Sequence, residues 1–271
     1  MAMPDDIPSP PFIEVDGIYN LRDLGGYAIN STTSIRRNFI YRSAHLSSVT
    51  ATGSKALVDQ LGVRRIYDFR SLGEAEKTPS VEIEGALRCH VPVFRDIDAS
   101  PEGLALRYGH YTSPNGVEGF VKAYSEISQA AAKHAFKVTF EHIRDRPTEA
   151  LLFHCAAGKD RTGVFAALVM RIAGVRDDDL IGYEYQLTEL GARHLREEII
   201  ERLAKHPALN GNREGAERMV SARAEAMKGT LKWLDETYGS AEGYLREAMG
   251  FSDEDIEIIR KNLVVDEKAI L

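Results

Sequence analysis

Near its middle the chain reads His154-Cys155-Ala156-Ala157-Gly158-Lys159-Asp160-Arg161-Thr162-Gly163, between two apolar runs. The run before it, Ala150-Leu151-Leu152-Phe153, predicts a short buried strand, and the run at 164–170 predicts a buried helix. The segment is therefore expected to form a strand-to-helix loop. At a helix N-terminus, unpaired backbone N–H groups and the helix dipole favour a bound anion.

The residue types in this loop suit a phosphate group and a thiolate nucleophile. Gly158 is expected to take the positive φ that turns successive N–H groups towards an anion. Arg161 offers a planar fork for two phosphoryl oxygens, and the same positive field favours the thiolate of Cys155. His154 is expected to hold the cysteine in place, and Thr162 to donate its hydroxyl to the sulfur. The predicted phosphate-binding residues are Ala156, Ala157, Gly158, Lys159, Asp160 and Arg161.

Two other interpretations of these residues are weaker. A cysteine and an arginine six positions apart occur by chance, but here they come with the additional His, Gly, Lys and Asp and with a strand–loop–helix setting. A metal site would draw on Cys89-His90 and His154-Cys155. Neighbours on a strand point to opposite faces, so each pair could supply only one ligand. We expect neither a metal nor a cofactor.

The loop resembles the active-site signature of the cysteine-dependent phosphatases. Among them it is most similar to the atypical tyrosine phosphatases related to secreted mycobacterial and listerial enzymes that act on phosphotyrosine and phosphoinositides. Further similar segments follow in order, at 20–26, 41–46, 67–71 and 238–245. The resemblance implies an α/β fold of the protein tyrosine phosphatase type. This fold has a four- or five-stranded, mostly parallel sheet flanked by helices, here with extra C-terminal helices. The resemblance also implies an enzyme that hydrolyses phosphomonoesters without metal, through a phosphocysteine.

Composition is in keeping with an enzyme of this size. With 271 residues, of which 44% are hydrophobic, the chain can bury a sizeable core. We predict a flexible leader at 1–11 and a single phosphatase domain at 12–271, with a helical C-terminal extension at about 178–271. The net charge of -7 argues against nucleic acid as a partner. The sequence does not indicate an oligomeric state.

The sequence also bears on location. Two cysteines imply no disulfide framework, and a catalytic thiolate suits a reducing compartment. The acidic, proline-rich start does not resemble a signal peptide, and no apolar run is long enough to span a bilayer. We expect a cytoplasmic enzyme, with export by another route left open.

Outside the central loop, helices and strands alternate, as in an α/β protein. Strands are predicted at 63–69 and 86–93, and an irregular loop near the active site at 96–115. Helices are predicted at 52–60, 119–146, 178–204, 213–237 and 253–263, the last with a capping box from Ser252 to Asp255. The resemblance suggests that some helices of the extension form a lid over the site. The alternative is that they only cover the sheet.

The general acid has several candidates. Asp160 precedes Arg161 in the loop, as in lipid phosphatases of the myotubularin type, and is the preferred choice. Asp96 and Asp98 follow a predicted strand, where the acid of related enzymes usually lies, and a reaction without a dedicated acid is the third possibility. Asp68 is expected to be structural, accepting hydrogen bonds from Arg42, Arg70 or loop amides, and Asp23 and Arg22 are interpreted in the same way.

The substrate is inferred from the surroundings of the loop. Lys159 either binds an additional phosphate or only orients the loop, and Tyr27, Phe94, Tyr108 and Tyr124 could line a cleft for a phenol ring or lie in the core. We predict a protein-tyrosine phosphatase with possible dual specificity and phosphoinositide activity. The alternatives are a phosphoinositide or inositol polyphosphate phosphatase, and a catalytically silent phosphate-binding module. A thiol oxidoreductase would need a resolving thiol, for which Cys89 alone is available.

Overall fold

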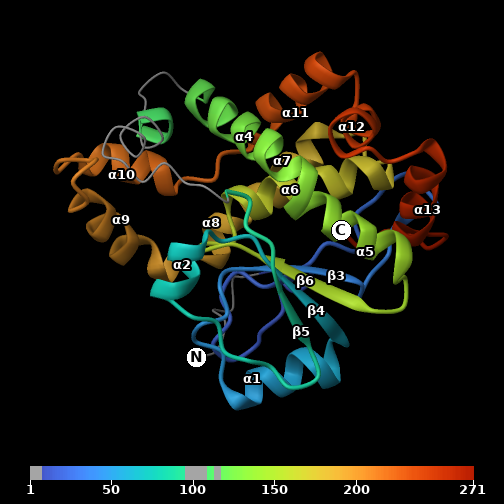
Figure 1. Cartoon of the computed structure of the whole chain (residues 1–271), viewed down its shortest axis with the longest axis horizontal. Coiled ribbons are helices and arrows are strands. Elements are labelled where there is room, and N and C mark those ends of the chain that lie inside the picture. Colours follow the sequence, from blue (N-terminus) through green and yellow to red (C-terminus); the bar gives the residue numbers. More distant parts are fainter. Residues whose placement is uncertain (1–7, 95–108, 113–116) are drawn as a thin grey trace.

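A five-stranded sheet forms the centre of the computed structural model, which describes residues 8–94, 109–112 and 117–271 (Figure 1). The strand order is β1-β3-β6-β4-β5, with β3, β6, β4 and β5 parallel and β1 antiparallel to β3. The predicted mostly parallel α/β sheet is confirmed. The strands are β1 (Arg22–Asp23), β3 (Ile40–Ser43), β4 (Val63–Asp68), β5 (Leu87–His90) and β6 (Ala150–His154).

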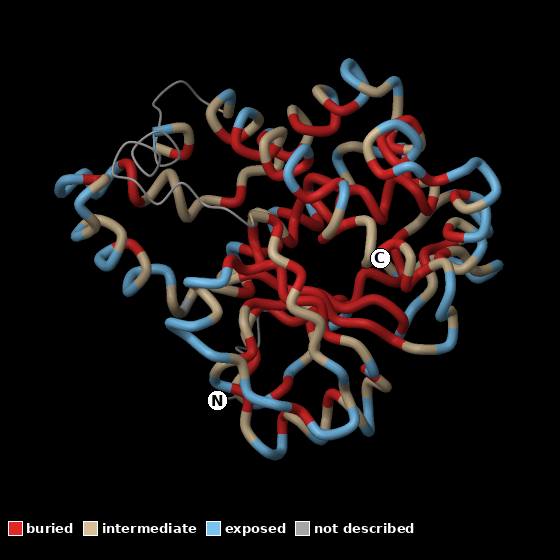
Figure 2. The backbone as a smooth tube through the Cα atoms, viewed as in Figure 1, coloured by how far each residue is buried: buried red, intermediate tan, exposed pale blue. Residues whose placement is uncertain are grey.

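The central strand β6 is buried on both faces, because its neighbouring side chains enter two different cores. Leu151 and Phe153 belong to the larger core, and Leu152 to the smaller one. This alternation follows from the two-residue period of a strand. The inner strands of the sheet and the helices next to them are accordingly among the most buried parts of the backbone (Figure 2), whereas the edge strand β5 is only partly buried.

Helices cover both faces of the sheet. The smaller core lies under α1 (Ala51–Lys55) and η1 (Ala56–Gln60), which together form the predicted helix at 52–60. The larger core lies under α4 (Glu118–Ala131), η2 (Ala132–Phe136), α5 (Lys137–Asp145), α6 (Asp160–Ala173), α7 (Asp178–Gln186), α11 (Ala224–Tyr238), α12 (Ala241–Tyr244), η4 (Leu245–Met249) and α13 (Asp253–Leu263). The capping box of α13 is confirmed, with Ser252 Oγ accepting from the Asp255 N–H.

The C-terminal extension departs from the prediction in two places. The helix predicted at 178–204 is divided into α7, α8 (Thr188–Gly191), η3 (Arg193–Leu195) and α9 (Arg196–Ala204). The helix predicted at 213–237 is interrupted after α10 (Arg213–Val220), where Ser221 is extended. No proline or glycine marks this second break, so the helical spacing alone could not reveal it. Helices α9 and α10 share a small core of their own beside the main body (Figure 1).

Two further features are the ribbon near the C-terminus and the edge at which the parallel strands end. The short ribbon of β2 (Ser34–Ile35) and β7 (Val264–Val265) ties the C-terminal segment to the N-terminal half. The carboxyl ends of β3, β4 and β6 meet at one edge, where His154 lies between Ser43 and Asp68. Ligands of open α/β sheets bind at this edge. Most of the predicted loop at 96–115 lies outside the described residues, as do residues 1–7 of the predicted leader.

Candidate active site

The predicted loop lies at the carboxyl edge of the sheet, between the end of β6 at His154 and the start of α6 at Asp160. Gly158 has a φ of +66°, and a Cβ at this position would lie 2.4 Å from the Ser43 carbonyl oxygen. Glycine is therefore required both by the backbone conformation and by the close approach of β3. Because α6 is a long helix, its dipole places partial positive charge at the loop.

Cys155 and His154 are both buried at the end of β6. The His154 Nδ1 lies 3.0 Å from the Cys155 carbonyl oxygen, which can only accept, so Nδ1 carries the proton. Burial lowers the pKa of His154 to about 4, so the ring is neutral at pH 7. The histidine thus fixes the backbone of the cysteine from behind without adding a charge.

Thr162 differs from the expectation. Its hydroxyl is buried, and among the residues that the structure describes it has no hydrogen-bond partner, the Cys155 sulfur included. The prediction for Thr162 is wrong for this state of the molecule.

Arg161 is engaged by a residue that the sequence analysis missed. Its Nη1 and Nη2 atoms lie 2.6 and 2.7 Å from the two carboxylate oxygens of Glu74. Burial alone would raise the pKa of Glu74, but the pair with Arg161 outweighs it and lowers that pKa to about 2. The other edge of the guanidinium, formed by Nε–H and the second Nη2–H, is not used by Glu74. One of the two hydrogen-bonding edges of the Arg161 guanidinium, which was predicted to bind phosphate, is thus occupied by Glu74.

Glu74 reaches Arg161 because of a local sequence pattern. It is the third residue of α2 (Leu72–Lys77) and accepts a hydrogen bond from the Ser71 N–H at 2.8 Å, which completes a capping box. The Ser71-Leu72-Gly73-Glu74 spacing is a signal for such a helix start, directly after β4. The sequence therefore indicated that Glu74 lies in the first turn of a helix, but it did not indicate that Glu74 pairs with Arg161.

Asp160 lies at the first position of α6 and accepts a hydrogen bond from a buried tyrosine. The Tyr124 hydroxyl donates to Asp160 Oδ1 at 2.7 Å and lies 2.5 Å from the Tyr185 hydroxyl. Burial, followed by the charge of Asp160, raises the pKa of Tyr124 well above its usual value, so Tyr124 keeps its proton. The other predicted acids, Asp96 and Asp98, lie outside the described residues.

The Lys159 side chain is engaged by groups of the protein itself. Its Nζ donates to the carbonyls of Met219 and Ser221 at 2.5 and 3.1 Å, and lies 3.2 Å from Asp160 Oδ1. The side chain is buried over the ring of Phe120. The amine thus ties the loop to the break between α10 and α11, and this geometry favours the loop-orienting interpretation over the phosphate-binding one.

Four aromatic residues were expected either to line a cleft or to lie in the core, and the structure describes three of them. Tyr27 and Tyr124 are fully buried, Phe94 is partly buried against the larger core, and Tyr108 lies outside the described residues. Tyr124 contributes to the site through its hydroxyl and not as the wall of a pocket. Of the two alternatives, the core position therefore holds for Tyr27 and Tyr124.

Asp68, Arg70, Arg22 and Arg42, which were expected to be structural, all take part in buried ion pairs. Asp68 accepts two hydrogen bonds from the Arg70 guanidinium, at 2.9 and 2.7 Å, and a third from the Arg70 backbone N–H at 3.1 Å. Burial would raise the pKa of Asp68, but these bonds lower it to about 2. Arg42 does not join this pair as one expectation allowed. It contacts Glu184, a second residue that the sequence analysis missed.

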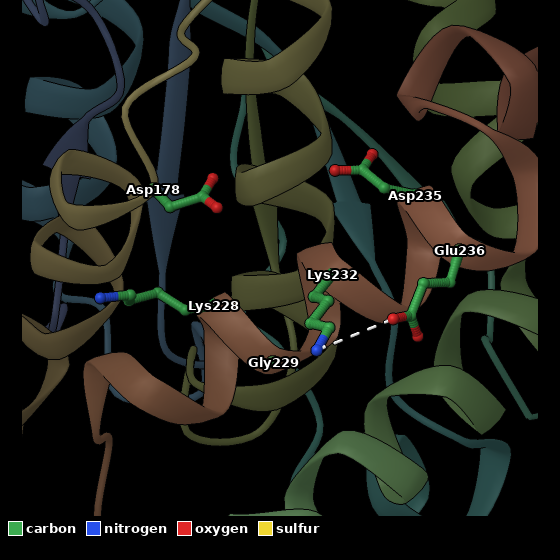
Figure 3. A pocket seen from close by; sticks show the side chains of 6 residues that line it. All are labelled: Asp178, Lys228, Gly229, Lys232, Asp235 and Glu236. Atoms are coloured by element: carbon green, nitrogen blue, oxygen red, sulfur yellow. Dashed lines mark ion pairs between the residues drawn. The ribbon is translucent and has the colours of Figure 1, made fainter.

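A surface depression lies between the start of α7 and the middle of α11 (Figure 3). Arg171, in the last turn of α6, pairs with two of its acidic residues, so the depression lies near the opposite end of α6 from the loop. Its charges are already paired, Lys232 with Glu236 at 3.8 Å and Lys228 with Asp179 at 2.6 Å. Asp178 pairs with Arg171 of α6. The depression therefore presents no free charge of one sign that would select a ligand.

A parallel α/β sheet that carries a cysteine–arginine loop between its central strand and a helix is the architecture of the cysteine-based phosphatases. The model of the tyrosine phosphatase family matches residues 13–265, and the chain belongs to this family. The chain is 28% identical over 268 residues to the triple specificity protein phosphatase PtpB of Mycobacterium tuberculosis, covering 87% of this chain and 93% of that protein.

Two further relatives carry similar names. A putative tyrosine-protein phosphatase of Cupriavidus necator is 28% identical over 237 residues, covering 86% of this chain and 82% of the relative. A tyrosine-protein phosphatase of Nostoc commune is 28% identical over 237 residues, covering 85% and 76%. The protein is thus a phosphatase. Within the described part of the chain, no helix is both long enough and apolar enough to cross a membrane.

Proposed function

We propose that the protein hydrolyses phosphotyrosine in proteins through a phosphocysteine on Cys155. The observation that carries the proposal is the position of Cys155, at the end of the central strand and directly before a loop that leads into the N-terminus of α6. In the first step the thiolate attacks phosphorus, and an S–P bond forms as the bond to the tyrosine oxygen breaks. In the second step water attacks phosphorus, and the S–P bond breaks to release phosphate and the thiolate.

Arg161 would stabilise the phosphoryl group in both steps. Glu74 holds one edge of the guanidinium, which leaves the Nε–H and the second Nη2–H for two equatorial oxygens. These oxygens carry the charge that is spread over the transition state, so the contact is strongest at that point. Glu74 is then a positioning residue that fixes the plane of the fork.

Asp160 would move the proton. As the acid it protonates the leaving tyrosine oxygen, and in the second step its carboxylate takes the proton from the attacking water. Its contact with the Tyr124 hydroxyl supports this role, because that bond fixes the carboxyl group beside the loop. Asp96, Asp98, or a reaction without a dedicated acid remain the alternatives that the Asp160→Asn variant tests.

The buried position of Lys159 supports phosphotyrosine over substrates with several phosphates. Its amine is held by two backbone carbonyls, so it does not provide a second cation for a phosphoinositide or an inositol polyphosphate. The names of the relatives from Cupriavidus necator and Nostoc commune point in the same direction. A thiolate nucleophile also suits a reducing compartment, which supports a cytoplasmic location, with export by another route as the alternative.

The test is phosphate release in the presence of EDTA, from a phosphotyrosine peptide and from a panel of phosphoinositides. The wild-type protein and the Cys155→Ser variant are measured side by side. Release from the peptide by the wild type alone supports the proposal. Equal or faster release from the lipids would make it a phosphoinositide phosphatase. No release from either would favour the silent phosphate-binding module.

A further inference from the structure

Two side chains from distant parts of the chain hold the loop between β6 and α6. Asn20 Nδ2 donates to the carbonyls of Ala157 and Gly158 at 3.3 and 3.2 Å. The Arg42 guanidinium donates to the same Gly158 carbonyl at 2.8 Å. Both side chains are buried, and they come from the N-terminal segment and from β3. Two consecutive carbonyls of the loop are therefore fixed by side chains more than one hundred positions earlier in the chain.

Fixing these carbonyls also fixes the N–H groups on the other side of each peptide. A trans peptide is planar, and its C=O and N–H point in opposite directions. When the Ala157 carbonyl is held by Asn20, the N–H of Gly158 must point the other way. When the Gly158 carbonyl is held by Asn20 and Arg42, the same applies to the N–H of Lys159. Both N–H groups belong to the predicted phosphate-binding loop.

Glu184 of α7 holds the two arginines behind the loop in place. Its carboxylate accepts from Arg22 Nε at 2.7 Å and from Arg42 Nη1 at 2.6 Å. Arg22 also donates to the side-chain oxygen of Asn20, at 2.5 Å. All four side chains are buried, and the cluster formed by Asn20, Arg22, Arg42 and Glu184 carries two positive charges against one negative charge.

We propose that this cluster positions the loop, so that Asn20 and Arg42 aim the N–H groups of Gly158 and Lys159 at the phosphoryl group and Glu184 fixes both arginines for that purpose. The inference rests on the proposed function, because it assigns the loop as the phosphate site. It also gives a role to the segments at 20–26 and 41–46, which no step of the reaction uses. The four side chains are positioning residues and do not touch the substrate.

A purely electrostatic role for the cluster makes the opposite prediction. The Glu184→Gln variant removes the negative charge and leaves two positive charges close behind an anion site, so an electrostatic role predicts tighter phosphate binding. A positioning role predicts weaker binding, because an amide holds the two arginines less firmly than a carboxylate. The sign of the change in affinity therefore separates the two roles.

The second variant is Asn20→Gly, with Asn38→Gly as its matched control. Both asparagines have a φ of 57°, which glycine adopts without strain. Asn38 contacts Asp23 and Tyr41 and none of the loop residues described here. Asn20→Gly removes two hydrogen bonds to the loop, and we expect about tenfold weaker phosphate binding. We expect Asn38→Gly to bind as tightly as its parent.

The experiment measures binding of inorganic phosphate by calorimetry, with all variants made in the Cys155→Ser background and each melting temperature recorded. Weaker binding by folded Asn20→Gly and Glu184→Gln, with the Asn38→Gly control unchanged, supports the inference. Unchanged or tighter binding by folded Asn20→Gly overturns it, and so does tighter binding by folded Glu184→Gln. If the folded Cys155→Ser parent itself binds no phosphate, the loop is not a phosphate site, and the proposed function fails together with the inference.

Discussion

Replacing Glu74 with glutamine tests whether the carboxylate aligns Arg161 or competes with the substrate for it. The substitution keeps the shape of the side chain and removes its charge. Glutamine is also accepted at the third position of a capping box, so the start of α2 is expected to survive. The change therefore acts mainly on the contact with the Arg161 fork.

The size of the effect follows from the ionisation of Glu74. Burial would raise the pKa of this carboxyl from 4.5, but the pair with Arg161 lowers it to about 2. At about 1.4 kcal/mol for each tenfold change in proton affinity, this corresponds to about 3 kcal/mol. The Glu74 side chain is 35% exposed, so solvent screening reduces the figure to about 1–2 kcal/mol. If that energy aligns Arg161, its loss lowers the rate about 5- to 30-fold.

The assay is steady-state hydrolysis of a phosphotyrosine peptide by the wild type, by Glu74→Gln and by Glu76→Gln. Glu76 lies on the exposed side of the same helix, so its variant controls for the loss of one acidic residue from α2. We expect kcat/KM to fall for Glu74→Gln and to remain unchanged for Glu76→Gln. An increase in kcat/KM for Glu74→Gln would show that the carboxylate competes with phosphate, and would refute the positioning role.

Three further predictions concern the loop and its surroundings. Arg161→Lys should lower kcat by about 10²–10³, because an ammonium cannot bind two phosphoryl oxygens in one plane, and a near wild-type kcat would contradict this. Asp160→Asn should slow phosphotyrosine hydrolysis more than hydrolysis of an aryl phosphate with a very good leaving group, whereas equal losses would assign the acid elsewhere. Burial lowers the pKa of His154 to about 4 in the folded protein. Between about pH 6.5 and pH 4 the histidine is therefore protonated in the unfolded chain but neutral in the folded protein. Urea unfolding should therefore show about 2–3 kcal/mol of stability lost from pH 7 to 4.5, and a smaller loss in His154→Asn; equal losses would exclude His154 as the cause.

The central part of the fold could be predicted because its signals are local. The strand at β6, the loop and the start of α6 follow from apolar runs separated by a glycine-containing turn, and the capping box of α13 follows from two residues. The break between α10 and α11 could not be predicted. It lacks proline and glycine, and the Lys159 amine holds two carbonyls beside it, which is a contact between distant parts of the chain.

The residues of the loop could be predicted from the sequence, but the two glutamates that hold its surroundings in place could not. Cys155, Asp160 and Arg161 are close together in the sequence. Glu74 contacts Arg161 only in the folded chain, and Glu184 contacts Arg42, which in turn donates to the Gly158 carbonyl of the loop. The sequence did contain a signal for the burial of Glu184, because this residue lies on the same helical face as the buried residues at 181, 185 and 188. A charged residue on such a face needs a buried partner, but the sequence does not say which one.

The measurement that tests the account most directly is identification of the phosphorylated residue during turnover. Wild-type protein is mixed with a phosphotyrosine peptide in EDTA, quenched in acid within a single turnover, digested and analysed by mass spectrometry. We predict phosphate on the peptide that contains Cys155, and none on the corresponding peptide from Cys155→Ser, which should also release no phosphate. Phosphate on another residue, or turnover by Cys155→Ser at the wild-type rate, would contradict a phosphocysteine mechanism.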